Sequence, residues 1–182
     1  MASKIKVDQI QTADGTGTIA LQNQLSGMTN LSLPSGSILQ VETLSRARTS
    51  TLNSTSASDI VLNDGVGNIE LTITPKYSDS TIVGWVSLCG VVQQTTARSI
   101  MISVYKNGSH YKTLDSHFCY NNVASSLYGH ENFTCNFSES NVNTTSAVTY
   151  SIRARTNGNM RFFDTHLATD PNNSLTLMEI KA

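Results

Sequence analysis

The stretch VTYSIRARTNGNMRF, residues 148–162, decides the fold class of this chain. In its first half, polar residues separate one regularly spaced apolar set, Val148, Tyr150, Ile152 and Ala154. Successive side chains of a β-strand point to opposite faces, so this alternation predicts a strand with one buried and one wet face. The Asn157–Gly158 pair then predicts a tight turn into a second strand containing Met160 and Phe162, which together make a hairpin.

The same alternation recurs along the chain, in ILQVET (38–43), NIELTIT (68–74), FTCNF (133–137) and SLTLMEI (174–180). Asn107 and Gly108 can supply the two positive φ angles of a second hairpin turn. Helical periodicity is scarce. We therefore predict an all-β chain with roughly eight or more strands between about residue 35 and the C-terminus, at spacings typical of a sandwich or barrel.

One stretch departs from strict alternation. In STIVGWVSLCGVVQ, residues 80–93, apolar side chains fall on both faces. A strand that is apolar on both faces is typical of one buried on both sides. We therefore expect a central strand covered on both faces.

The composition excludes several classes of protein. Charged residues make up 14% of the chain and its net charge is −1. Lysine and arginine are scattered singly, so no nucleic-acid partner is expected. No apolar stretch is long enough for a membrane span, and residues 1–20 lack a secretory signal, so we expect no membrane insertion. Three cysteines without C-x-x-C spacing indicate reduced thiols, with Cys89 and Cys135 as small buried residues.

The first 33 residues differ from the rest. Pro34 and Gly36 interrupt any strand pairing, which predicts a boundary between residues 1–33 and 34–182. The opening segment contains KIKVDQIQTADGTGTIALQNQ (4–24) and too few apolar residues to fold alone: Ile5, Val7, Ile10, Ile19 and Leu21. It must therefore stay disordered or become ordered by packing against copies of itself and the surface to which it attaches.

Two octapeptides echo each other, DGTGTIAL (14–21) and DGVGNIEL (64–71). Both match Asp-Gly-x-Gly-x-Ile-x-Leu, in which a glycine turn leads into an alternating strand. Neither completes a phosphate-binding glycine loop before a helix. A plain turn followed by a strand is the interpretation we adopt for both.

Candidates for catalysis or metal binding are weak. Asp115 with His117, and Asp164 with His166, are spaced to share one face of a strand, but no spacing matches a multi-ligand metal motif. The chain lacks a G-x-S-x-G nucleophile elbow. Carboxylate pairs such as Glu131 with Glu139 could be nominated for glycoside hydrolysis only arbitrarily. We expect no catalytic residues, no metal and no cofactor.

The stretch HFCYNNVASSLYGHENF, residues 117–133, is the candidate binding surface. Amides, hydroxyls and flat aromatic rings can match the edges and faces of sugars. The proposed receptor-binding residues are Tyr120, Asn121, Asn122, Tyr128 and His130. The alternative is a long solvated loop whose tyrosines cover the end of the sandwich.

The residues SKIKVDQIQTADGTGTIALQNQLSGMT, LPSGSILQVE and the final NNSLTLMEIKA resemble tail-fibre-like virion proteins of bacteriophages, particularly of marine and cyanobacterial hosts. The resemblance implies that residues 1–33 dock to the virion through Ile5, Val7, Ile10, Ile19 and Leu21, and that the protein assembles in the bacterial cytoplasm. The remainder is similar to jelly rolls of the complement and tumour-necrosis-factor type, which implies a homotrimer.

Together these observations predict a non-enzymatic virion appendage, a tail fibre or similar, whose jelly-roll head binds a host-surface glycan or receptor. One alternative is a capsid decoration or head-fibre protein with a purely structural role. A glycan depolymerase is the enzymatic alternative.

Overall fold

The structure is a computed structural model that describes residues 33–47, 50–93, 98–121, 131–163 and 172–182. The chain divides into two units, Met1–Leu33 and Pro34–Ala182. The described residues form strands and turns, and no helix among them could cross a membrane. The predicted all-β class is confirmed.

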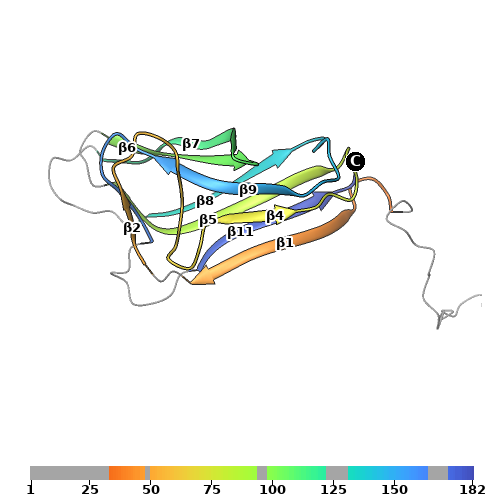
Figure 1. Cartoon of the computed structure of the whole chain (residues 1–182), viewed down its shortest axis with the longest axis horizontal. Coiled ribbons are helices and arrows are strands. Elements are labelled where there is room, and N and C mark those ends of the chain that lie inside the picture. The colour runs from red at the N-terminus through yellow and green to blue at the C-terminus, as the bar shows by residue number, and fades with distance from the viewer. Residues whose placement is uncertain (1–32, 48–49, 94–97, 122–130, 164–171) are drawn as a thin grey trace, which may run out of the picture. The chain divides into compact units, whose positions relative to one another are not determined.

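The strands of the second unit form two antiparallel sheets that pack as layers (Figure 1). Sheet 1 contains β1 (Ile38–Ala47), β11 (Asn172–Ile180), β5 (Thr81–Gln93), β8 (Glu131–Glu139), β10 (Met160–Phe162) and β2 (Leu52–Ser54). Sheet 2 contains β3 (Ile60–Val61), β4 (Glu70–Ile73), β9 (Val148–Arg155), β6 (Arg98–Lys106) and β7 (Ser109–Asn121).

The strand order identifies the sandwich as a jelly roll. Without the short β2, β3 and β10, sheet 1 runs β1-β11-β5-β8 and sheet 2 runs β4-β9-β6-β7. Numbered along the chain, these eight strands are β1, β4, β5, β6, β7, β8, β9 and β11. Sheet 1 then contains the first, eighth, third and sixth, and sheet 2 the second, seventh, fourth and fifth. Each consecutive pair crosses between sheets except β6 and β7, as expected for two interleaved Greek keys.

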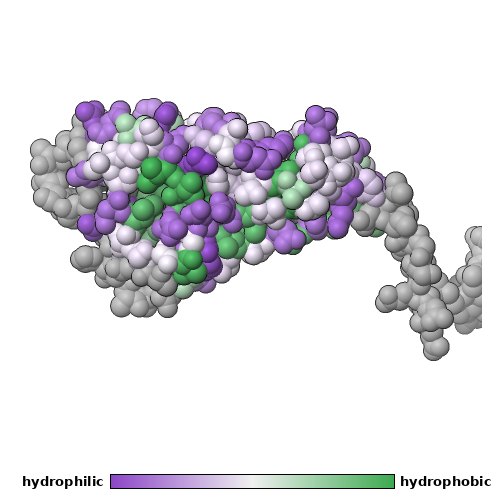
Figure 2. Space-filling view, in the orientation of Figure 1, coloured by the Kyte–Doolittle hydropathy of each residue, from purple (hydrophilic) through white to green (hydrophobic). Residues whose placement is uncertain are grey.

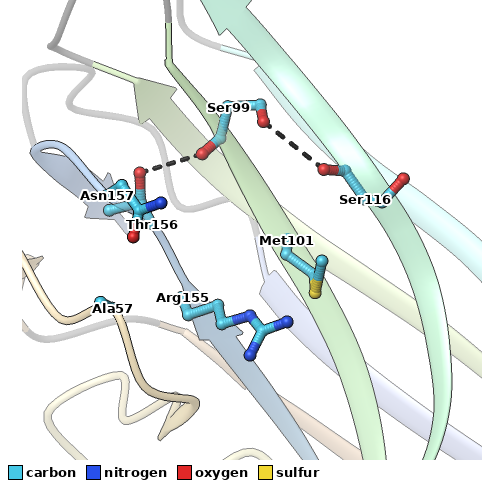
Figure 3. Close-up of a pocket in the computed structure, with 7 residues that line it drawn as sticks. All are labelled: Ala57, Ser99, Met101, Ser116, Arg155, Thr156 and Asn157. Carbon is cyan, nitrogen blue, oxygen red and sulfur yellow. Dashed lines mark hydrogen bonds between the residues drawn. The ribbon is translucent and has the colours of Figure 1, made fainter.

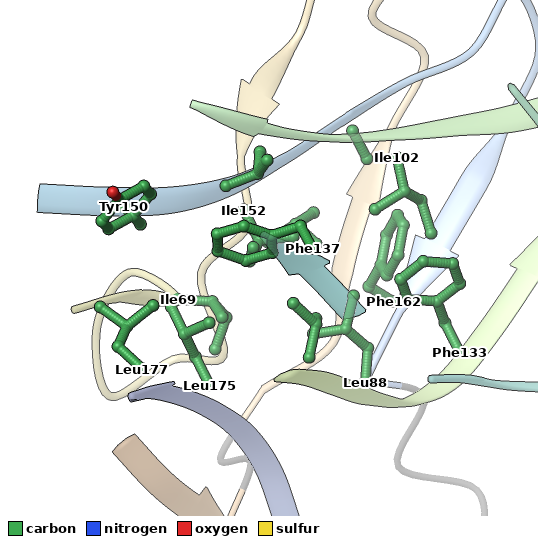
Figure 4. Packing of buried hydrophobic residues seen from close by; sticks show 14 of the residues in the cluster. Ile69, Leu88, Ile102, Phe133, Phe137, Tyr150, Ile152, Phe162, Leu175 and Leu177 are labelled. Atoms are coloured by element: carbon green, nitrogen blue, oxygen red, sulfur yellow. The ribbon is translucent and has the colours of Figure 1, made fainter. Parts of the chain in front are cut away.

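The core lies between the two sheets, and the alternation of residues 148–155 fills its centre. Val148, Tyr150, Ile152 and Ala154 are fully buried, as predicted. Tyr150 packs against Phe137 of the opposite sheet, with ring centroids 5.5 Å apart (Figure 4). This contact joins β9 to β8 across the sandwich.

Residues 80–93 form a central strand of sheet 1, as predicted, but the prediction that both faces are covered is wrong within the subunit. Ile82 and Val86 of β5 are buried, but Trp85, which points the other way, is 40% exposed. The pattern looked two-sided for two reasons. The outward face of β5 is itself apolar, and a register shift with Gly90 at φ 59° places consecutive residues in the core after Leu88.

The predicted hairpin across Asn157–Gly158 is also wrong. The strand before this turn, β9, pairs with β3, β4 and β6 of sheet 2, whereas β10 pairs with β2 and β5 of sheet 1. The turn carries the chain from one sheet to the other. Alternation and turn residues cannot distinguish a hairpin from such a crossing, because both need only a tight reversal.

Other local predictions are confirmed. Asn107 and Gly108 have φ angles of 49° and 81° and connect β6 to β7 as a hairpin. In DGVGNIEL, Asp64 Oδ1 accepts hydrogen bonds from the backbone N–H groups of Val66 and Gly67, so the motif is a capped turn followed by β4.

The cysteines are thiols, not disulfides. Cys89 is buried in the core as predicted, but Cys135 is only partly buried. Cys135 lies opposite the buried Val86 in the β5–β8 pair. Its neighbours on the same face of β8, Phe133 and Phe137, are buried.

Candidate functional site

A shallow hollow of about 310 Å³ lies where the ends of β6, β7 and β9 meet the segment before β3 (Figure 3). Its lining residues carry hydroxyl, amide and guanidinium groups beside one thioether: Ala57, Ser99, Met101, Ser116, Arg155, Thr156 and Asn157. These groups present both hydrogen-bond donors and acceptors.

Hydrogen bonds fix the positions of the lining hydroxyls. Thr156 Oγ1 donates to the carbonyl of Ser99 at 2.9 Å, and Ser99 Oγ donates to the carbonyl of Ser116 at 3.4 Å (Figure 3). The backbone N–H of Thr156 donates to the carbonyl of Ser56 at 2.9 Å. The hollow is therefore assembled from strand ends that are already linked to one another.

The segment that forms one wall is shaped by its own serines. The backbone N–H of Ser56 donates to Ser54 Oγ, and that of Ser58 donates to Ser56 Oγ, both at 3.1 Å. Serine hydroxyls readily replace backbone partners in this way, which favours turns over strand pairing. The segment Ser54–Ser58 thus leaves the sheet and borders the hollow.

Arg155 brings positive charge to the hollow. Its side chain is 44% exposed, and its Nε lies 3.7 Å from Oδ1 of Asp59. The other oxygen of Asp59 accepts a 2.5 Å hydrogen bond from the hydroxyl of Tyr105. That hydrogen bond, with a contribution from burial, raises the pKa of the Tyr105 hydroxyl. The guanidinium extends toward Met101 (Figure 3).

A second arginine stabilises this cluster from the same sheet face. The guanidinium carbon of Arg153 lies 4.1 Å from the centroid of the Tyr105 ring, within the range of a cation–π contact. His110 meets the same ring edge-on, with centroids 5.4 Å apart. Tyr105 is thereby held against Asp59, and Asp59 against Arg155.

The receptor-binding residues predicted from sequence are described only in part. Tyr120 lies in β7 and is 55% exposed, and Asn121 ends the same strand. Asn122, Tyr128 and His130 lie outside the described residues. Residues 117–121 are strand rather than loop, so β7 reaches further than the sequence indicated. Asn121 pairs with Arg98, next to Ser99 of the hollow, so Tyr120 and the hollow share one end of sheet 2.

An irregularity in β7 turns Tyr120 outward. Phe118 and Cys119 both pack against the core, because Cys119 has a φ of 53° and alternation fails there. Burial, together with the neighbouring Glu131, raises the pKa of the Cys119 thiol. Tyr120, the next residue, faces solvent.

The predicted docking residues, Ile5, Val7, Ile10, Ile19 and Leu21, all lie outside the described residues. The boundary between the two units falls between Leu33 and Pro34. On the far side of it, the backbone N–H of Gly36 donates to the carbonyl of Lys181 at 2.8 Å. The start of the second unit is thus bound to the C-terminal residues.

The pairs nominated for metal binding or hydrolysis have other contacts. Asp115 Oδ1 accepts a 2.7 Å hydrogen bond from the backbone N–H of His117, and no cluster of metal-ligand residues occurs in the part of the chain that the structure describes. Asp164 and His166 lie outside that part. Glu131 and Glu139 are at opposite ends of β8, about 26 Å apart at the rise of a strand, which is too far to flank one glycosidic bond.

A second surface carries no charge in its two central rows. Directly paired residues of antiparallel strands share a face, so the register places rows of side chains on the outside of sheet 1. We call this the uncharged face, and its two central rows are Val41, Met178, Val83 and Ser138, and Thr43, Thr176, Trp85 and Asn136. Val41 is 50% exposed and lies here, not in the core as alternation with Leu39 suggested, because β1 has a register shift after Ile38.

Apolar groups also gather elsewhere on the surface. On the side seen in Figure 2, hydrophobic residues form separate patches surrounded by hydrophilic ones. The uncharged face differs in that its two central rows contain no charged side chain. Within it, Val41 and Trp85 are exposed large hydrophobic residues.

Sequence reasoning missed the hollow. Its residues come from four separate stretches, and the only local signals were the serine- and threonine-rich composition of residues 50–58 and the turn residues at 156–159. No motif links Ser99, Ser116 and Arg155. Only the jelly-roll topology brings them together.

No protein-family model matches the chain, and no curated protein sequence matches it. Among solved structures, the chain is similar to the infectious bursal disease virus VP2 subviral particle, with a TM-score of 0.49 and 12% sequence identity. The similarity covers 91% of this chain and 37% of that one, so the chain spans well under half the length of its structural relative.

Proposed function

We propose that this chain is a non-enzymatic virion appendage protein of a bacteriophage, in which residues 1–33 dock to the particle and residues 34–182 form a head that binds a host-surface glycan. The observation that carries the binding role is the hollow beside Arg155. It offers the hydroxyls of Ser99 and Ser116, an amide and a guanidinium. Such groups can match the hydroxyl edges of sugars, while Met101 provides a small apolar contact.

The docking role rests on the opening segment. Residues 1–33 form a unit of their own and resemble the opening segment of tail-fibre-like virion proteins. The apolar residues Ile5, Val7, Ile10, Ile19 and Leu21 would then be buried against the particle. Assembly would take place in the bacterial cytoplasm, where thiols such as Cys89 stay reduced.

The head would be a homotrimer that buries the uncharged face. Trp85 lies in the middle of this face with 40% of its surface exposed, and Val41 and Ile38 on β1 are 50% and 56% exposed. Burial of such residues against sister heads would remove apolar surface from water without desolvating a charge. Sheet 2, which carries the hollow and Tyr120, would remain outside.

The test separates the two parts of the chain. The described core lies within Pro34–Ala182, so we expect this fragment to fold and to compete with intact particles for adsorption to host cells. The same fragment, lacking residues 1–33, should not co-sediment with particles. The full chain should do both.

The alternatives give different outcomes. A decoration protein would raise the thermal stability of the capsid, and its head would not slow adsorption. A glycan depolymerase would release new reducing ends from host polysaccharide. If the head neither competes for adsorption nor binds host glycan, the proposed binding role is wrong.

A further inference from the structure

A second hollow lies on the other side of the turn that follows β9. It also has a volume of about 310 Å³, but unlike the first its lining is uncharged: Asn53, Ser54, Thr55, Asn159 and Met160. The same two segments, 53–57 and 155–160, contribute to both hollows. The two hollows are therefore neighbours, separated by the contact between these segments.

Hydrogen bonds made by Thr156 hold that contact. Thr156 is 3% exposed and takes part in three hydrogen bonds. Its N–H donates to Ser56 O and its hydroxyl donates to Ser99 O, both at 2.9 Å. The same hydroxyl accepts from the N–H of Gly158 at 3.1 Å. The bond from Thr156 to Ser56 joins the two segments that separate the hollows, so the ligand-free protein already brings both hollows together. Preorganisation of this kind lowers the entropy lost on binding.

The two hollows have related chemistry. Each lining combines hydroxyl and amide groups, from Ser99, Ser116 and Asn157 in the first and from Asn53, Ser54, Thr55 and Asn159 in the second. Repeated hollows with similar linings fit a ligand made of similar units joined in a line. A linear polysaccharide has this form, with hydroxyl edges and small apolar faces on each sugar.

The charge beside the hollows favours an anionic ligand. Among the described residues that line the two hollows, Arg155 is the charged one, and its side chain is 44% exposed. In the described part of the chain, Asp59 is the ion-pair partner of Arg155 and engages it through Nε.

The engaged Nε leaves the two Nη atoms of Arg155 as donors on the opposite side of the guanidinium. A planar pair of N–H donors matches the two oxygens of a carboxylate. We propose that the two hollows together bind a linear acidic polysaccharide, with a uronate carboxylate on Arg155 and the neighbouring sugars reaching the second hollow. This rests on the proposed glycan-binding function and specifies the class of glycan.

The test uses the full chain and oligogalacturonates of one to six sugars, compared by calorimetry with the same oligomers as methyl esters. We expect affinity to rise about tenfold or more between dimer and tetramer, and the esters to bind about tenfold more weakly. Arg155→Gln should abolish the difference between acid and ester. Asn159→Ala should weaken the tetramer but not the monomer, and Lys112→Gln, an exposed cation elsewhere on sheet 2, should change neither.

Equal affinity for acid and ester, affinity independent of length, or no binding of any oligogalacturonate would overturn the proposal. Adsorption of the same variants to host cells separates this from the wider function. If Arg155→Gln adsorbs like the wild type, the acidic-glycan site is wrong while the appendage role stands. If the wild-type protein itself does not adsorb, the proposed function fails.

Discussion

The hydroxyl of Ser80 donates a 2.7 Å hydrogen bond to Oε1 of Glu179, a carboxylate with no solvent exposure that lies 99 residues further along the chain. The backbone N–H groups of Lys76 and Tyr77 donate to the same oxygen at 2.7 and 3.3 Å, and Gln40 Nε2 donates to Oε2 at 2.7 Å. One buried side chain of β11 thus holds the β4–β5 connection and β1 together.

We expect Glu179→Gln to destabilise the protein although it preserves the shape of the side chain. The amide loses the charge that strengthens four hydrogen bonds, and its NH₂ group must face a donor. Hydrogen bonds to a charged group contribute about 1.5–3 kcal/mol each, so a net loss of about 2 kcal/mol or more in the free energy of unfolding is expected. Urea denaturation at neutral pH measures it.

Glu42→Gln provides the matched control, because Glu42 lies on β1 with its side chain exposed. It should change the unfolding free energy by less than about 0.5 kcal/mol. Wild-type stability for Glu179→Gln would contradict the role assigned to this carboxylate.

Gly84→Ala should be destabilising for a steric reason. A Cβ at this position of β5 would lie 2.2 Å from Cζ of Phe137, a fully buried ring that packs against Tyr150. Overpacking of a core typically costs about 1–3 kcal/mol. Phe137→Leu should create room, so the double variant should be more stable than the sum of the two single effects predicts. A double-mutant cycle by urea denaturation tests the coupling, and strict additivity would show that the two side chains do not clash.

The sequence predicted the fold where the deciding contacts were local. The alternation of Val148 and Tyr150 with polar neighbours reports directly on burial, and the positive φ angles at Asn107 and Gly108 need only their own residue types. The sequence did not predict which sheet each strand joins. β9 and β10 belong to different sheets because each pairs with strands far away in sequence. The sequence did not predict the hollow for the same reason: Ser99, Ser116 and Arg155 meet only after the strands have paired.

Because of Tyr150, we expect the free energy of unfolding to fall steeply in alkaline solution. Burial, and then the hydrogen bond to Glu139, raise the pKa of its hydroxyl above the ordinary value of 10.0. The unfolded chain ionises near pH 10 while the folded chain does not, so this contribution is fully present below pH 10 and is lost as the pH rises above it. Urea midpoints measured from pH 8 to pH 11 report the loss.

Tyr150→Phe removes the ionising group. At neutral pH it should cost about 1 kcal/mol, because the hydrogen bond to Glu139 disappears, although Lys106 Nζ still contacts that carboxylate at 2.5 Å. Its decline above pH 10 should be shallower than that of the wild type. If the stability of the two proteins declines in parallel above pH 10, Tyr150 does not cause the loss of stability in alkaline solution.

Trp85 should report directly on the proposed trimer. It is the only tryptophan of the chain and lies on the uncharged face, 40% exposed in the isolated subunit. Trp85→Glu would place a charge in the buried interface, so light scattering should shift from three times 19.7 kDa toward the monomer mass. Val66→Glu, at an exposed hydrophobic residue of the turn before β4, should leave the trimer intact. A wild-type protein that is monomeric at micromolar concentration would contradict the trimer.

Tyr120→Ala is expected to weaken adsorption to host cells without unfolding the head. The ring is 55% exposed at the end of β7, on the same sheet as the hollow and away from the uncharged face. Removal of a flat aromatic contact from a polar binding surface typically costs about 1–2 kcal/mol, which corresponds to roughly a five- to thirty-fold loss of affinity. Its melting temperature should scarcely change, because exposed substitutions usually cost under about 0.5 kcal/mol. Val66→Ala serves as the control at an equally exposed position in the turn before β4. Unchanged adsorption together with a large fall in melting temperature would instead place Tyr120 in a subunit contact, and the receptor surface would have to be sought at the hollows alone.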